Sequence, residues 1–175
     1  MGASNWLYQV SYQENIGQAL QDLRNQIFEE GKYYKTWDDE LDENPPEPQT
    51  IEELLEINGT DGTHSIIDIE QVLDRPVSRE EWQRQNDSPY SKWNVNMGVV
   101  SPVSSENLVK IFGTDKPTGA DLKKVIIDMA NPEKAGRRLL DDIEDILPGR
   151  YHGIHIILYK DNKHDEIFFC GFSGD

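Results

Sequence analysis

The sequence predicts an α+β fold, in which a small, mainly antiparallel sheet is covered by several helices. Residues 6–13 alternate between apolar and polar side chains, and residues 151–172 hold the densest run of strand-forming residues. The residues between them show mostly helical spacing. Because helices and strands are mixed rather than strictly alternating, a parallel doubly wound sheet is disfavoured. A length of 175 residues suits one domain over residues 1–175 with one core.

The first strand places Trp6, Tyr8, Val10 and Tyr12 on one face. A helix follows, because apolar residues recur at three- and four-residue spacing as far as residue 27. Asn15 is placed to cap its start and Gly31 to end it. The chain therefore opens with a strand and a helix that packs back on the aromatic face.

Residues 36–49 form an exposed loop that is rich in acids and prolines, with too few apolar groups to offset the entropy of ordering. Thr50 and Glu53 have the spacing of a capping box and start a short helix. Residues 64–72 then predict a central strand, with Ile67 and Ile69 on one face. The other face of this strand carries His64, Ile66, Asp68 and Glu70.

Capping and turn signals predict the remaining elements. Ser78 starts a short helix, residues 97–103 form a short strand, and Ser104 or Ser105 caps the next helix. Thr118 and Asn131 begin two more helices. The last two strands form an antiparallel hairpin, which residues 160–166 join through a longer loop.

The net charge of −16 is unevenly distributed. Residues 36–74 hold thirteen of the 33 acidic residues and no Lys or Arg, so the rest of the chain is close to neutral. This pattern argues against direct binding to nucleic acid or an anionic membrane, because both need clustered basic residues. A basic protein partner is the electrostatic complement.

No apolar run approaches the length of a membrane helix, and we recognise no signal peptide, so we expect a cytoplasmic protein. The single cysteine fits a reducing compartment.

The predicted partner-binding site lies in the acidic loop, where an aromatic and an aliphatic anchor stand among carboxylates. It comprises Trp37, Asp38, Asp39, Glu40, Leu41, Asp42 and Glu43. The alternative is that this loop only solubilises the protein.

An alternative catalytic site would lie on the polar face of the sheet, where a histidine close to carboxylates suits acid–base chemistry near neutral pH. It comprises His64, Asp68, Glu70 and His155. We expect no metal and no cofactor. His152 and His155 face opposite sides of one strand, and Cys170 lies in an apolar strand, where packing is its expected role.

Three segments carry a resemblance, namely residues 6–13 with the helix that follows, residues 61–69, and residues 165–175. They resemble a scattered family of uncharacterised bacterial cytoplasmic proteins, which implies no known activity. In size and acidity the chain is also similar to bacterial immunity proteins that neutralise basic toxins.

The favoured function is therefore a non-enzymatic acidic binding protein that inhibits or regulates a basic protein partner. The alternatives are a small hydrolase or transferase using the His and carboxylate site, and a subunit of a larger bacterial assembly. The oligomeric state stays open.

Overall fold

The structure is a computed structural model that describes residues 4–36, 45–78, 80–81, 98–129, 146, 149 and 151–173, with the backbone alone for 126–129. It confirms an α+β fold. In chain order the described elements are β1 (Asn5–Ser11), α1 (Ile16–Glu29), α2 (Ile51–Asn58), the 3₁₀ turns η1 (Gly59–Asp61) and η2 (Ile66–Asp68), β2 (Gln71–Val72), β3 (Val99–Pro102), α4 (Ser105–Phe112), α5 (Gly119–Met129), β4 (His152–Lys160) and β5 (Lys163–Phe172).

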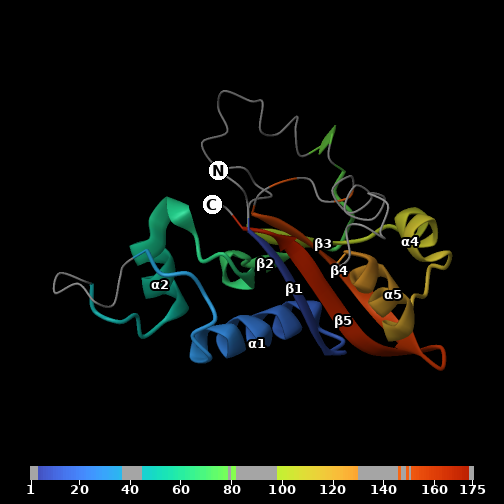
Figure 1. Ribbon diagram of the computed structural model, residues 1–175, viewed down its shortest axis with the longest axis horizontal. Helices are drawn as coiled ribbons and strands as arrows, with labels where there is room; N and C mark the ends of the chain where they lie inside the picture. The colour runs from blue at the N-terminus through green and yellow to red at the C-terminus, as the bar shows by residue number, and fades with distance from the viewer. Residues whose placement is uncertain are drawn as a thin grey trace.

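The sheet has the order β1-β5-β4-β3-β2 and is mixed, so the prediction of a mainly antiparallel sheet was wrong. β5 pairs antiparallel with β1 and β4, whereas β3 pairs parallel with β4 and β2. Parallel neighbours need a long crossover, and the chain between β3 and β4 supplies one that includes α4 and α5. Figure 1 shows this arrangement, with β1 and β2 at the two edges.

The predicted central strand over residues 64–72 was wrong for most of its length. Residues 66–68 form η2, and only Gln71 and Val72 pair as a strand. The Ser65 hydroxyl accepts a hydrogen bond from the Ile67 N–H, which closes a turn and ends the alternation expected of a strand. As a result Ile66, Ile67 and Ile69 are all fully buried instead of facing opposite sides.

The connection between β4 and β5 is also shorter than the sequence predicted. The strands extend to Lys160 and Lys163, so Asp161 and Asn162 alone make the turn, both with positive φ. Asp and Asn tolerate this left-handed backbone better than other non-glycine residues, and it matches the twist of paired strands. The polar composition of residues 160–166 therefore reflects an exposed end of the strands and not a long loop.

The predicted helix starts are confirmed where they fall on described residues. Asn15 accepts a hydrogen bond from the Gln18 N–H, and Thr50 and Ser104 do the same at the starts of α2 and α4. Thr118 and Asp121 exchange hydrogen bonds at the start of α5. The helices predicted from Ser78 and Asn131 lie mainly outside the described residues.

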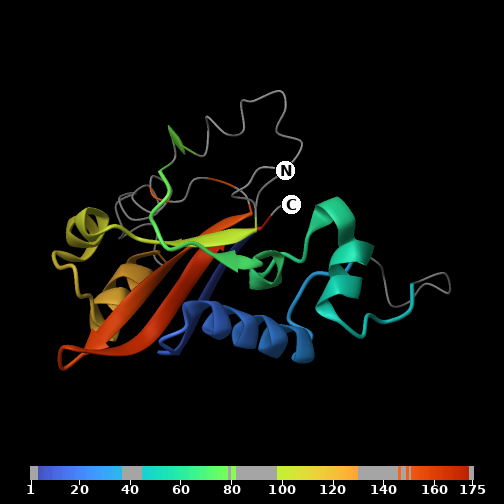
Figure 2. The same ribbon diagram turned by 180° about the vertical axis from the view of Figure 1, so that it is seen from behind.

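Helices cover both faces of the sheet (Figures 1 and 2). On one face α1 and η2 pack against β1 and β5, with Phe169, Leu20 and Ile66 among the fully buried side chains. On the other face Leu122 of α5 and Leu108 of α4 pack against Ile154 and other apolar residues of β4 and β5. β4 and β5 are therefore buried on both sides over most of their length, as their continuous apolar runs require, whereas alternate residues of β1 such as Leu7 are exposed.

The Trp6 indole lies against two glycines of the neighbouring strands. Gly171 pairs with Trp6 on β5, and Gly153 pairs with Gly171 on β4. A Cβ atom at either glycine would overlap the indole ring. The ring thus fills the space that two missing side chains leave, which explains glycine inside buried strands.

α2 lies beyond the end of α1, away from the sheet, in both views (Figures 1 and 2). Its Ile51 and Leu54 side chains are buried in the same core as α1. Among the described helices, none combines the length and apolar character needed to cross a membrane.

Candidate functional site

The segment Trp37 to Glu43, with its five carboxylates, lies outside the described residues. Its flanks are described on both sides. Lys35 before the gap and Glu47 after it form a salt bridge with 2.6 Å between the Lys35 Nζ and Glu47 Oε1 atoms. The two ends of the predicted partner-binding loop are therefore held together, close to α2.

α2 and η1 carry the described part of the acidic region. Glu52, Glu53 and Glu56 are exposed on α2, opposite its buried Ile51 and Leu54, and Asp61 is exposed on η1. We call these four residues the acidic face. None of their carboxylates forms a salt bridge with another described residue. Within the described part of the chain, Arg24 is a positive charge that Glu52 interacts with, and it does so without an ion-pair contact.

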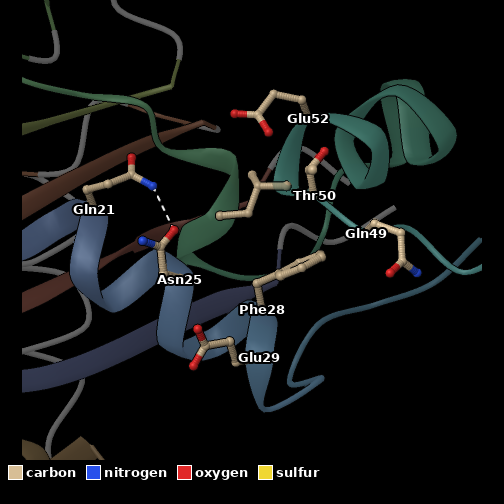
Figure 3. Close-up of a pocket in the computed structure, with 8 residues that line it drawn as sticks. Gln21, Asn25, Phe28, Glu29, Gln49, Thr50 and Glu52 are labelled. Carbon is tan, nitrogen blue, oxygen red and sulfur yellow. Dashed lines mark hydrogen bonds between the residues drawn. The ribbon is translucent and has the colours of Figure 1, made fainter.

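A hollow of about 330 Å³ lies beside the acidic face, between α1 and the start of α2. Figure 3 shows side chains from both helices around it. Its lining residues are Gln21, Asn25, Phe28, Glu29, Gln49, Thr50, Ile51 and Glu52. Most of these residues are exposed, so the hollow is open to solvent and needs no movement to admit a ligand.

Of the predicted catalytic residues, His64, Asp68 and Glu70 lie in or next to the turn that contains η2, and His155 lies on β4. His64 stacks on Tyr34, with 4.1 Å between ring centroids and an angle of 9° between the planes. Its backbone has a φ of 53°, which few non-glycine residues adopt. Glu70 is exposed, and its N–H donates to the Gly98 carbonyl at 2.6 Å.

Asp68 stabilises the loop that precedes it. Its Oδ1 atom accepts a hydrogen bond from the Thr63 N–H at 2.8 Å, and its side chain is buried. The Asp68 carboxylate also lies so close to Gly62 that a Cβ there would come within 2.9 Å of Oδ2. Asp68 thus holds residues 62–68 in their turn, which is a structural role.

His155 is buried on the α1 face of the sheet, beside the Phe169 ring. Burial lowers its pKa to about 4, and no carboxylate of the described residues raises it. A histidine that worked with Asp68 or Glu70 would instead have its pKa raised by the negative charge. The structure therefore does not bring His155 into an acid–base pair with either carboxylate.

His152 and His155 face opposite sides of β4, as predicted. His152 is fully buried and hydrogen-bonds through Nε2 to the Ser101 Oγ of β3 at 3.1 Å. Sequence reasoning missed this pair, because it depends on the parallel register that sets β3 beside β4. Both side chains are at most 1% exposed, so the hydrogen bond satisfies buried polar groups and leaves a substrate no access.

Cys170 is buried in the core that α4 and α5 cover, on the other side of the sheet from Trp6. This position agrees with the predicted packing role. Burial raises the pKa of its thiol to about 12, so the thiol stays protonated at neutral pH. Within the part of the chain that the structure describes, no three His, Cys, Asp or Glu side chains gather in a way that could hold a metal ion.

Comparisons with protein-family models find no match, and comparisons with curated proteins and with solved structures find no significant one. The acidic face and the hollow beside it are the features of the described surface with the most distinctive chemistry.

Proposed function

We propose that the protein is a non-enzymatic binding protein whose acidic region recognises a basic protein partner and inhibits or regulates it, as immunity-type proteins do. The observation that carries the proposal is the concentration of thirteen acidic residues, with no Lys or Arg, between residues 36 and 74. Four of them form the acidic face, in which α2 carries Glu52, Glu53 and Glu56 and η1 carries Asp61.

Several features support this class of function. Complementary charge speeds association and excludes partners of the wrong sign. Trp37 and Leu41 would add the apolar anchors that charge alone does not supply, because aromatic residues dominate binding energy at interfaces. The proposal takes the protein to be cytoplasmic, as the sequence predicts. It also takes the protein to bind neither nucleic acid nor a membrane directly.

A pull-down followed by identification of the partner and titration with purified components tests the proposal. The dissociation constant should rise with salt, because screening weakens interactions between exposed charges. The triple variant Glu52→Gln, Glu53→Gln, Glu56→Gln should bind more weakly and depend less on salt. Neutralising Asp38, Asp39, Glu40, Asp42 and Glu43 together should have the same effect.

A matched control removes the same charge elsewhere, through Glu14→Gln, Glu106→Gln and Asp165→Asn, which are exposed and lie outside the acidic region. This control variant should bind as the parent does. Affinity that is insensitive to salt, or equal losses in the two triple variants, would contradict recognition through the acidic region.

A further inference from the structure

The outer edge of β1 faces no other strand of the described chain, because β1 ends the sheet order and pairs only with β5 (Figure 1). At one end of this pairing the Ser173 N–H donates to the Ser4 carbonyl at 2.9 Å. At the other end the Tyr12 N–H donates to the Asp165 carbonyl at 3.0 Å. Hydrogen-bonded residues alternate along an antiparallel strand, so the even-numbered residues of β1 point their backbone groups toward β5. The odd-numbered residues point theirs outward, namely Asn5, Leu7, Gln9 and Ser11.

The outward backbone groups of β1 are open to solvent. All four odd-numbered residues are exposed, and the Leu7 side chain, which is 40% exposed, is a large apolar group that the fold leaves uncovered. No described residue forms a backbone hydrogen bond with these outward groups. A row of unpaired N–H and C=O groups is a template on which a further strand can pair.

β1 also lacks the features that usually keep edge strands apart, which are charged side chains, proline, a bulge or short length. Its seven residues include no proline, and its register with β5 has no shift. Residues 4–13 hold no charged residue, in a chain of which 29% is charged. The opposite edge of the sheet, β2, has only two residues. The described sheet therefore has one long edge that is free to pair.

The sequence of β1 suits pairing with its own copy. In an antiparallel pair of two β1 strands centred on Tyr8, Leu7 of each copy lies opposite Gln9 of the other. Every outward-pointing residue then meets another, so that all of the outward N–H and C=O groups find partners. On the face that α1 covers, Trp6 lies opposite Val10 and the two copies of Tyr8 lie opposite each other. Cross-strand pairs of aromatic and β-branched residues stabilise sheets.

Charge distinguishes a second copy from a strand of a basic protein. β1 offers no carboxylate to a basic strand, and Glu166 of β5 already accepts a hydrogen bond from the Gln9 side chain at 2.6 Å. The net charge of −16 opposes association of two copies. Pairing through an uncharged strand brings no like charges directly opposite each other, so it is the contact that this repulsion hinders least.

We propose that β1 pairs antiparallel with β1 of a second copy of this chain, about a two-fold axis at Tyr8, which joins the two sheets into one. The assembly closes at a dimer, because the pairing uses the same long edge of both copies. The contact depends on one strand from each copy, so the dimer should dissociate on dilution. This inference does not depend on the proposed basic partner.

Amide hydrogen exchange, followed residue by residue with nuclear magnetic resonance, tests the pairing. In dilute protein the amides of Leu7, Gln9 and Ser11 should exchange fast, because their N–H groups face solvent. Their exchange should slow in proportion to the dimer fraction, which sedimentation velocity measures over the same concentrations. The amides of Tyr8 and Val10 should be protected at every concentration, because they donate to β5.

A lysine on the edge should weaken the dimer. Leu7→Lys should raise its dissociation constant by about three- to tenfold, because the two copies of this side chain lie diagonally across the pair. Val109→Lys is the matched control, since it puts the same charge on another exposed apolar residue, on α4. The control should dimerise as the parent does, and both variants should keep the melting temperature of the parent in dilute protein.

Ser11→Pro is a second variant that acts on the backbone. It removes one outward N–H but no hydrogen bond to β5, and proline is tolerated on an edge strand where the N–H faces solvent. The variant should also weaken the dimer. Salt distinguishes this contact from the proposed basic partner: screening should strengthen the dimer of two acidic chains and weaken binding of the basic partner.

Several results would overturn the inference. These are a protein that stays monomeric at every concentration, assemblies larger than a dimer, a dimer in which the Leu7 and Gln9 amides stay unprotected, and equal losses in Leu7→Lys and Val109→Lys. Protection of these amides that appears only with an added basic protein would assign the edge to a strand of that protein instead. None of these results bears on recognition through the acidic region, because β1 contributes no acidic residue.

Discussion

The indole of Trp6 restricts the residue type at two positions that lie about 150 residues away in the chain. Gly153 and Gly171 pair with each other on β4 and β5, and neither has room for a side chain beneath the ring. The contact joins three strands at one point. Because the interior is close-packed, a change in side-chain volume there would strain all three strands.

Gly153→Ala should lower the free energy of unfolding by about 1 to 3 kcal/mol, the usual cost of overpacking a core. The new methyl group would overlap the Trp6 ring and come within 2.9 Å of the Cys170 carbonyl oxygen. Urea denaturation measures the change. Gly119→Ala is the control, because a Cβ there meets only ordinary contacts and alanine favours the helix, so this variant should be equally or more stable.

His155 should make the protein less stable in mild acid. Burial lowers its pKa from 6.5 to about 4, so between these values the unfolded chain takes up a proton that the folded protein excludes. Stability should fall as the pH drops through this window, by about 3 kcal/mol in total. In His155→Leu this part of the loss should disappear, which urea denaturation at several pH values would show. Equal pH dependence in the two proteins would contradict the burial of a neutral imidazole.

At the scale of elements, α2 depends on its first turn. The Thr50 hydroxyl accepts from the Glu53 N–H at 3.2 Å, and the Glu53 carboxylate accepts from the Gln49 N–H at 2.7 Å. The helix has only eight residues, so intrinsic helix stability contributes little and these caps matter more. The same turn positions Gln49 and Glu52 at the hollow.

Thr50→Ala should lower the free energy of unfolding by about 1 kcal/mol, because the cap is lost. Amide hydrogen exchange in α2 should accelerate more than in α1 if the helix opens locally. Thr50→Ser keeps the hydroxyl and serves as the control, with expected exchange rates close to those of the parent. Unchanged protection of α2 in Thr50→Ala would show that packing of Ile51 and Leu54 alone holds the helix.

The elements that could be predicted are those whose cause is local. Asn15, Thr50 and Ser104 cap helices through residues only three positions away, so sequence spacing reveals them. The strand expected over residues 64–72 forms only at Gln71 and Val72, because local hydrogen bonds that sequence spacing did not reveal decide the conformation of the residues before them. The Ser65 hydroxyl and the Asp68 carboxylate accept hydrogen bonds from nearby N–H groups and make a turn there, and three buried isoleucines fit either conformation.

Strand neighbours depend on causes that are not local. β3 lies parallel to β4 although about fifty residues separate them, and nothing in Val99–Pro102 specifies its partner or its direction. The buried pair of Ser101 and His152 and the mixed sheet both follow from this register, so neither could be predicted. The hollow is likewise built from two helices that are distant in sequence, whereas the acidic region is continuous and could be recognised from composition.

At the scale of the whole molecule, the net charge of −16 acts against the folded state, because compaction brings like charges together. Raising the salt concentration from about 0.01 M to about 1 M shortens the screening length from about 30 Å to about 3 Å. The melting temperature should therefore rise with salt.

The triple variant Glu52→Gln, Glu53→Gln, Glu56→Gln should show a smaller rise in melting temperature, because part of the repulsion is already removed. The control variant Glu14→Gln, Glu106→Gln, Asp165→Asn carries the same net charge but keeps the acidic region intact. If both variants respond to salt equally, the repulsion is spread over the molecule and is not concentrated at residues 36–74.

The pairing of β1 with β5 has a consequence for how the protein is made. During synthesis β1 leaves the ribosome long before β5, and until β5 arrives its aromatic face has no strand beside it. Contacts between segments so far apart in sequence close slowly, because a long loop must be ordered first. α1 follows β1 directly and contributes to the same core, so it is the element available to shield Trp6, Tyr8 and Val10 in the growing chain.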